Sequence, residues 1–289
     1  PEKPDHLPAV TFLLSTAPGE ERSALATLDS LNALRGAGWQ VQVVLTNGVD
    51  LAVYQAQAAV DGRVRSPLHL NELTLTSLQA MATDFVVFCR AGDVFHPAFL
   101  ERFHDALMTA PGSAVYYTDC EQAQTGSNVS IPFFKPSANS PELMLSFNYL
   151  SRGFIRTGAL ADFRISQVEF TDAMELEYAI LLSFLARSLP MQHFPVVLVS
   201  LSQLTRLVSE QCAKILAAQY QGEGMSDVRV AVNSGSYRVN WELGNPSVSL
   251  IILNQNHADW LRNLIHSIFT LTEYPNYSII VVDNQSTQA

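Results

Sequence analysis

The C-terminal stretch 247–286 constrains the fold most strongly, because it joins two apolar strands through one amphipathic helix. Residues 248–253 form an apolar run of strand length, and residues 277–283 form a second run that ends on Asp283. Between them, Trp260, Leu264 and Ile268 recur at the spacing of one helix face. Such a unit is typical of a parallel sheet, and open α/β sheets bind ligands at the carboxyl ends of their strands. Asp283 is therefore predicted at a ligand-binding edge.

The rest of the chain repeats this plan. Strands are predicted to begin at residues 9, 39, 84, 113 and 196, with helices at 19–34, 71–82, 96–110, 171–187 and 202–221. Residues 121–135 look turn-like, 140–147 a short helix and 228–243 a hairpin. Together these elements predict an α/β fold with a mostly parallel sheet and helices on both faces. The similarity between 9–48 and 246–286 indicates an internal duplication, and hence tandem domains.

Composition narrows the function. The chain has 289 residues and a formal net charge of −10, which argues against nonspecific binding to nucleic acid. A nucleotide ligand stays open, because one metal ion can supply local positive charge. No apolar run approaches the roughly 18 residues of a membrane-spanning helix. Cys89, Cys120 and Cys212 are spaced neither as metal ligands nor as a disulfide framework. We read both ends as cut from a longer chain, because the first residue is not Met.

Two segments carry a resemblance to a known family. The sequences Val248-SLIILNQNHADWLRNLIHSI and Tyr274-PNYSIIVVDNQST resemble the opening of glycosyltransferase family 2, whose members have the GT-A fold and use nucleotide sugars. The stretch 113–155 is similar to the Tyr-Ser-Asp-Glu-Asp, Phe-Lys-Pro and Asn-Tyr pattern of the tandem type found in O-antigen and other surface-polysaccharide synthesis. The resemblance implies a GT-A-like domain at 1–201, a helix–hairpin connector at 202–245 and a truncated second family 2 domain at 246–289.

The resemblance also implies a site, and the first copy departs from it. The family's Asp-x-Asp, which holds Mn²⁺ or Mg²⁺ against the sugar diphosphate, reads Arg90-Ala91-Gly92, and only the next acid, Asp93, is left as a metal ligand. Arg90 would be an alternative source of positive charge. The nucleotide-sugar-binding positions implied are Thr46, Asn47, Asp93, Asp119, Asn254, Asn256, Asp283 and Asn284, with Thr46 in place of the base-binding Asp.

The catalytic base of the family stands at the start of a late helix, where this chain has Glu175 and Glu177. The alternative is that these acids only favour the helix dipole or are solvated. A nucleotidyltransferase is disfavoured, because residues 15–19 lack Lys and Arg.

Two hypotheses of function follow. In the first, the protein transfers a sugar from a nucleotide-sugar donor to a glycan or lipid-linked glycan, in the cytoplasm or at the inner face of the cytoplasmic membrane. In the second, residues 9–200 are a catalytically silent GT-A module that docks on the second glycosyltransferase domain or binds its acceptor.

Overall fold

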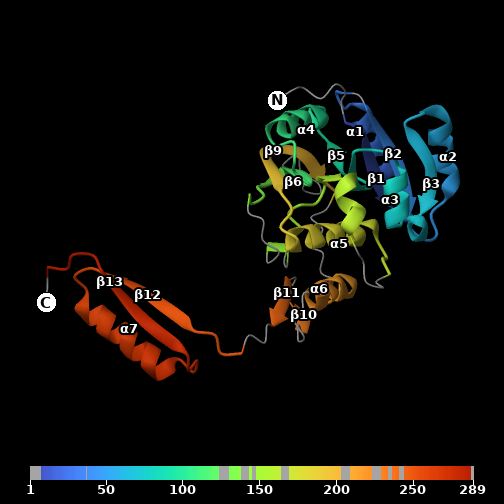
Figure 1. Ribbon diagram of the computed structural model, residues 1–289. Coiled ribbons are helices and arrows are strands. Elements are labelled where there is room, and N and C mark those ends of the chain that lie inside the picture. Colours follow the sequence, from blue (N-terminus) through green and yellow to red (C-terminus); the bar gives the residue numbers. More distant parts are fainter. Residues whose placement is uncertain are drawn as a thin grey trace. The chain divides into compact units, whose positions relative to one another are not determined.

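The computed structural model describes residues 8–36, 38–123, 130–137, 143–144, 148–163, 169–202, 209–222, 229–233, 236–240 and 244–287. The chain divides into two compact units, which are treated separately below: unit 1, Pro1–Asn240, and unit 2, Trp241–Ala289 (Figure 1). The short helix predicted at 140–147 lies largely outside the described residues. No described helix is long and apolar enough to cross a membrane.

A mixed sheet forms the centre of unit 1. Its described strands are β1 (Val10–Thr16), β2 (Trp39–Leu45), β3 (Val64–His69), β4 (Phe85–Arg90), β5 (Val94–Phe95), β6 (Val115–Ala123), β7 (Ser130–Phe133), β8 (Phe154–Arg156) and β9 (Met191–Leu201). Their order is β3-β2-β1-β4-β8-β6-β9-β5, with β7 beside β6. The β1, β2, β3 and β4 pairs and the β6–β9 pair are parallel, whereas β5, β7 and β8 run antiparallel to their neighbours. The predicted fold class is confirmed.

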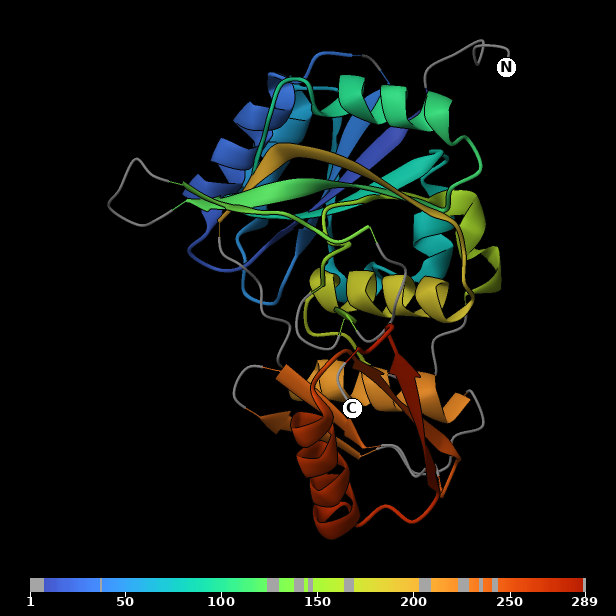
Figure 2. The ribbon, with the colours of Figure 1, turned by 90° about the vertical axis from the view of Figure 1, so that its left-hand side faces the viewer.

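Helices cover both faces of this sheet. They are α1 (Glu21–Asn32), α2 (Leu51–Val60), α3 (Leu75–Ala80), α4 (Phe99–Thr109) and α5 (Ala173–Ala186), with 3-10 turns η1 (Leu70–Glu72) and η3 (Thr157–Asp162). Figure 2 shows α4 on one side of the sheet and α5 on the other. Beneath α4, Phe103 stacks on Phe154 with ring centroids 3.8 Å apart, and Phe99 stacks on the same ring. This aromatic core fixes the β4–β8–β6 part of the sheet, which carries the site.

Helix α5 is buried along nearly its whole length. All residues from Ala173 to Leu185 are buried, and α6 (Glu210–Gly222) packs against the helix. The hairpin β10 (Arg229–Asn233) and β11 (Ser236–Asn240) follows α6, and the Tyr237 hydroxyl donates to the carbonyl of Ser209 at 3.0 Å. The described part of the predicted connector therefore packs within unit 1, up to Asn240.

Some elements differ from the sequence-based expectation. Residues 121–135, expected as turns, contain the end of β6 and strand β7, and the helix expected at 71–82 is the turn η1 followed by α3. Helix α2 and strand β3 were not predicted. The apolar residues of α2 surround the helix instead of forming one stripe, and β3 is an edge strand interrupted by Pro67. Both segments therefore lack the periodicity that marks their neighbours.

Unit 2 is the predicted strand–helix–strand unit. It consists of β12 (Val248–Asn254), α7 (Ala258–Leu271) and β13 (Tyr277–Asp283), with the strands parallel. Asn254 pairs with Asp283 at the same point of the register where Thr16 pairs with Leu45 in unit 1. Side chains alternate between faces along a strand, and one face of this small sheet stays exposed. That open face carries Ile251, Leu253, Ile280 and Val282.

Candidate functional site

The strand order of unit 1 reverses between β1 and β4, which is where open α/β sheets bind ligands. Strand β4 ends there on Arg90, beside Ser15 of β1. The chain then turns through Ala91, Gly92 and Asp93 into β5. The amide of Ala91 donates to the carbonyl of Ser15 at 2.9 Å, which ties the turn to β1. The segment Arg90–Gly92, which the resemblance aligned with a metal-binding motif, is thus at the carboxyl edge of the sheet.

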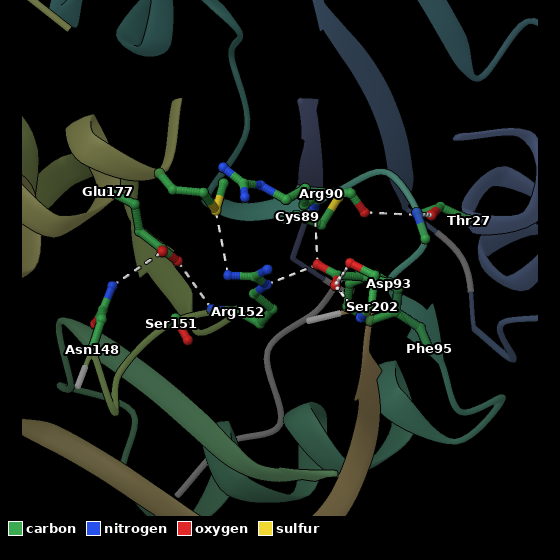
Figure 3. A network of polar contacts seen from close by, with 12 residues as sticks. Thr27, Cys89, Arg90, Asp93, Phe95, Asn148, Ser151, Arg152, Glu177 and Ser202 are labelled. Atoms are coloured by element: carbon green, nitrogen blue, oxygen red, sulfur yellow. Dashed lines mark hydrogen bonds and ion pairs between the residues drawn. The ribbon is translucent and has the colours of Figure 1, made fainter. Parts of the chain in front are cut away.

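The carboxylate of Asp93 is fully buried within this turn (Figure 3). Its Oδ2 accepts from the backbone amide of Arg90 at 2.9 Å and from Nε of Arg152 at 2.8 Å. Its Oδ1 accepts from the amide of Ser202 at 3.2 Å and from the Ser202 hydroxyl at 3.4 Å. A carboxylate has about four lone-pair positions, so these four donors occupy all of them. Asp93, predicted as the metal ligand, therefore does not fit that role.

Gly92 also excludes a second carboxylate from the turn. Its φ is +90°, a backbone conformation that side chains other than glycine rarely adopt. A Cβ at this position would lie 2.8 Å from Cβ of Ser202. Across the described residues, no group of three or more His, Cys, Asp or Glu side chains is arranged to hold a metal ion. The donor set at this edge does not fit the Mn²⁺ or Mg²⁺ that the resemblance implied.

Arg90 is held by an ion pair of its own. Its guanidinium pairs with Asp172, which is also the N-cap of α5 and accepts from the amide of Met174 at 2.9 Å. Burial lowers the pKa of Arg90 from its usual value, and the nearby Arg152 guanidinium lowers it further. The ion pair joins the end of β4 to the start of α5 across the site.

The two candidate bases, Glu175 and Glu177, lie in the first turns of α5 and both are buried. Glu175 accepts from the amide and hydroxyl of Thr171 at 2.8 and 3.0 Å, and from the hydroxyl of Ser209 at 3.3 Å. Glu177 accepts from the amide of Arg152 at 2.9 Å and from the side chain of Asn148 at 3.2 Å. Burial raises the pKa of Glu177 to about 7. Both carboxylates are thus bound by donors of unit 1 itself.

Asp119 lies on β6 and is buried as well. It accepts from the amide of Lys135 at 2.8 Å and pairs with Nε2 of His193 at 2.8 Å. The His193 ring stacks on Tyr117 at 4.8 Å, and the ammonium of Lys135 donates to the carbonyl of Ser151 at 2.9 Å. Asp119 therefore joins β6, β9 and the segment after β7.

Thr46 and Asn47 follow β2. The hydroxyl and amide of Thr46 donate to the carbonyl of Thr16, and Asn47 is exposed. The register shows that the counterpart of Asp283 in unit 1 is Leu45, because Leu45 pairs with Thr16 as Asp283 pairs with Asn254. Thr46, which the resemblance placed at the base-binding Asp, is the next residue along the chain, and its role stays a prediction. Leu45 is fully buried, so this edge of unit 1 lacks the polar group.

Unit 2 keeps the polar edge. An open cleft of about 420 Å³ lies at the ends of β12 and β13, lined by Leu253, Asn254, Gln255, Val282, Asp283 and Asn284. Asp283 accepts from the amide and hydroxyl of Ser286, and these bonds hold the pKa of its carboxyl below the usual range. Asn256 lies outside the lining but fixes the same edge, because its side chain accepts from the amide of Thr287 at 2.7 Å.

Four residues of the unit 1 site escaped sequence reasoning: Arg152, Ser202, Lys135 and His193. Arg152 and Lys135 are nearly fully buried cations, at 2% and 5% exposure. Lys135 precedes Pro136 and Arg152 precedes Gly153, within the segments 133–136 and 148–153 that the resemblance had already marked. A search for charged residues inside apolar segments would have found them. Ser202 carries no such signal.

The chain matches no protein-family model. It is 27% identical over 215 residues, or 71% of its length, to the O-antigen biosynthesis protein RfbC of Myxococcus xanthus. It is 24% identical over 286 residues, or 91% of its length, to the uncharacterized protein y4gI of Sinorhizobium fredii. The chain spans 17% and 31% of the length of these two proteins.

Among solved structures, S. aureus TarS residues 1–349 in complex with UDP-GlcNAc superposes with a TM-score of 0.55 at 12% identity, covering 76% of this chain and 68% of TarS 1–349. The same TarS fragment crystallised separately gives a TM-score of 0.53 at 13% identity, covering 76% and 67%. The protein has the GT-A fold of glycosyltransferases. Within that class, it is a distant homologue of RfbC that corresponds to part of that longer protein.

Proposed function

We propose that the chain is part of a glycosyltransferase that transfers a sugar from a nucleotide-sugar donor to a growing bacterial surface polysaccharide, and that unit 1 is its catalytically silent module. The observation that carries the second half is the turn after β4. There the metal-binding carboxylates are replaced by Arg90 and Gly92, and Asp93 has no free lone pair. The first half is supported by the GT-A fold and by the relation to RfbC, whose name gives O-antigen biosynthesis.

The charges around Arg90 favour a catalytically silent unit 1 over a unit 1 that binds the donor without a metal ion. Arg90 is already paired with Asp172, and the carboxylates of Glu20, Asp93 and Glu175 act on it as well. A sugar diphosphate would have to displace Asp172 and then face these remaining negative charges. Arg152, the other cation that acts on Arg90, is already paired with Asp93. The positive charge of Arg90 therefore neutralises Asp172 and is not free to bind a sugar diphosphate.

Unit 2 supports the donor-binding role. Its cleft lies at the carboxyl ends of two parallel strands, and Asp283 is an exposed acceptor there. We assign the nucleoside part of the donor to Asp283, Asn254 and Asn284, with a divalent cation as the expected cofactor of the completed second domain. The acceptor would be a glycan or lipid-linked glycan at the cytoplasmic face of the membrane, and unit 1 would bind it or dock the second domain.

Calorimetry of the 289-residue protein tests the silence of unit 1. UDP-GlcNAc and GDP-mannose are titrated with and without Mn²⁺, using the Asp283→Ala variant to remove the site of unit 2. We expect no binding to this variant under either condition. Mn²⁺-dependent binding to Asp283→Ala that disappears in the double variant Asp283→Ala/Asp93→Asn would overturn the silent role.

The transferase half is tested on the full-length protein to which the chain belongs. Membranes that contain it are expected to incorporate labelled sugar from a nucleotide donor into polysaccharide, and Asp283→Ala should reduce that incorporation at least tenfold, because one lost charged hydrogen bond costs more than about 1.4 kcal/mol. Equal incorporation by a strain lacking the protein would refute the assignment.

A further inference from the structure

Unit 1 contains a cation inside its core. Arg152 is 2% exposed, and its Nε donates to Oδ2 of Asp93 at 2.8 Å (Figure 3). Its Nη1 lies 3.3 Å from the sulfur of Met174 on α5, and its amide donates to Glu177 of the same helix at 2.9 Å. One residue thus connects the turn after β4, the segment before β8 and helix α5.

The backbone at this residue is held in an uncommon conformation. The φ of Arg152 is +60°, in the left-handed region that favours glycine, although glycine is the next residue. Gly153 cannot exchange places with it, because a Cβ on Gly153 would lie 2.8 Å from the carbonyl oxygen of Leu150 and 3.0 Å from that of Tyr116. Strained positions of this kind persist where the surroundings determine them, here through the bond from Arg152 to Glu177.

The guanidinium is what makes a buried Asp93 tolerable. An isolated carboxylate in a protein interior is strongly disfavoured and needs a paired charge or a metal. Burial alone would lower the pKa of Arg152, but the carboxylates of Asp93 and Glu177 raise it above the usual arginine value, so the side chain stays charged. A divalent cation can neutralise acidic side chains at such an edge, and here an arginine does so.

We propose that Arg152 is the resident cation of unit 1, which neutralises Asp93 in place of a divalent metal and makes the folding of this unit independent of metal ions. The proposal uses the GT-A fold and the contacts of Asp93, and it does not depend on whether unit 1 transfers sugar.

Thermal unfolding of the 289-residue protein tests it. The unfolding temperature of unit 1 is expected to be the same in EDTA and in Mn²⁺. Arg152→Met should lower it by roughly 10 °C, as expected for one partner removed from a buried pair. Arg187→Met breaks a weak pair with the exposed Asp162 and a distant contact of the guanidinium with the Phe184 ring. It is the matched control and should shift the unfolding temperature by no more than about 2 °C.

A second variant separates charge neutralisation from packing. Asp93→Asn combined with Arg152→Met removes both charges and is expected to unfold at a higher temperature than Arg152→Met alone. If the double variant is no more stable than the single one, Arg152 acts by packing and the proposal is wrong. It is equally wrong if Mn²⁺ stabilises the wild type and Asp93→Asn abolishes that effect. The comparison of the wild type in EDTA and in Mn²⁺ tests the proposal even if Arg152→Met does not fold. Its result does not depend on whether the protein binds a nucleotide sugar.

Discussion

Glu177 combines full burial with a titration near neutral pH. Burial is the largest cause of the rise in its pKa to about 7, and the Arg152 guanidinium and amide offset it only in part. The unfolded chain releases this proton near the ordinary value of 4.5. Between these two values the folded protein retains a proton that the unfolded chain has lost. This contribution to stability is therefore complete below about pH 4.5 and is lost as the pH rises through about 7.

Replacing Glu177 with Gln should remove that dependence. We expect the free energy of unfolding of the wild type, relative to Glu177→Gln, to decrease between pH 4.5 and 7 by on the order of 3 kcal/mol. Urea unfolding at several pH values measures the difference, with the exposed Glu101→Gln as the control variant. A difference between wild type and Glu177→Gln that is constant with pH would contradict the expectation.

The candidate residues illustrate what sequence can and cannot supply at this scale. Asp93, Glu175, Glu177 and Asp119 were all selected because the family resemblance implied a binding or catalytic role at these positions. All four are buried, and each carboxylate accepts hydrogen bonds from donors of unit 1. Sequence reveals the type of side chain, whereas its partners depend on contacts between distant segments, such as Arg152 with Asp93.

Among the elements, the start of α5 is stabilised by two interactions of one side chain. Asp172 caps the helix through the amide of Met174 and pairs with Arg90. Asp172→Asn keeps a good cap and loses the ion pair, whereas Asp172→Ala loses both. We expect the alanine variant to be less stable than the asparagine variant by about 1 kcal/mol. Chemical unfolding of both variants checks this, and equal stabilities would show that the cap contributes nothing.

The turn after β4 is expected to be sensitive to substitution of its glycine. Gly92→Ala adds a Cβ at φ +90° and 2.8 Å from Cβ of Ser202, and should destabilise the protein by roughly 2 kcal/mol. Adding Ser202→Gly removes the clash and should restore part of the loss. Gly158→Ala, with no atom near the added Cβ, is the control. A fully stable Gly92→Ala variant would mean that this turn relaxes freely.

Element prediction succeeded where one period dominated. The strands that became β1, β2, β4 and β12 and the helices α1 and α7 have clear apolar patterns and were found close to their observed ranges. Strands β5 and β8 have only two and three residues, too few for any period. Both depend on partners that are distant in the sequence: β8 lies between β4 and β6, and β5 pairs with β9 although it follows β4 in the chain.

At the scale of the whole molecule, unit 2 taken by itself has an apolar surface on one face of its sheet. Ile251 and Ile280 pair directly across β12 and β13 and are 66% and 47% exposed. Adjacent exposed apolar residues on an unpaired sheet favour association. The 289-residue protein is therefore expected to self-associate through this face.

The double variant Ile251→Lys/Ile280→Lys should stay monomeric in sedimentation experiments at concentrations where the wild type forms larger species. Unfolding of unit 1 should be unchanged in it. Val60→Lys, which alters an 86% exposed apolar residue of unit 1, is the control and should behave as the wild type. Identical sedimentation of the wild type and the double variant would contradict the prediction.

The space beside Gly92 has a consequence for which substitutions this turn accepts. An acidic residue at position 92 would need a different backbone conformation, because the φ there is +90°, and more room, because its Cβ would lie 2.8 Å from Cβ of Ser202. A single change of Gly92 to an acid would therefore strain the loop. We expect such an acid to be accepted only together with a smaller residue at position 202.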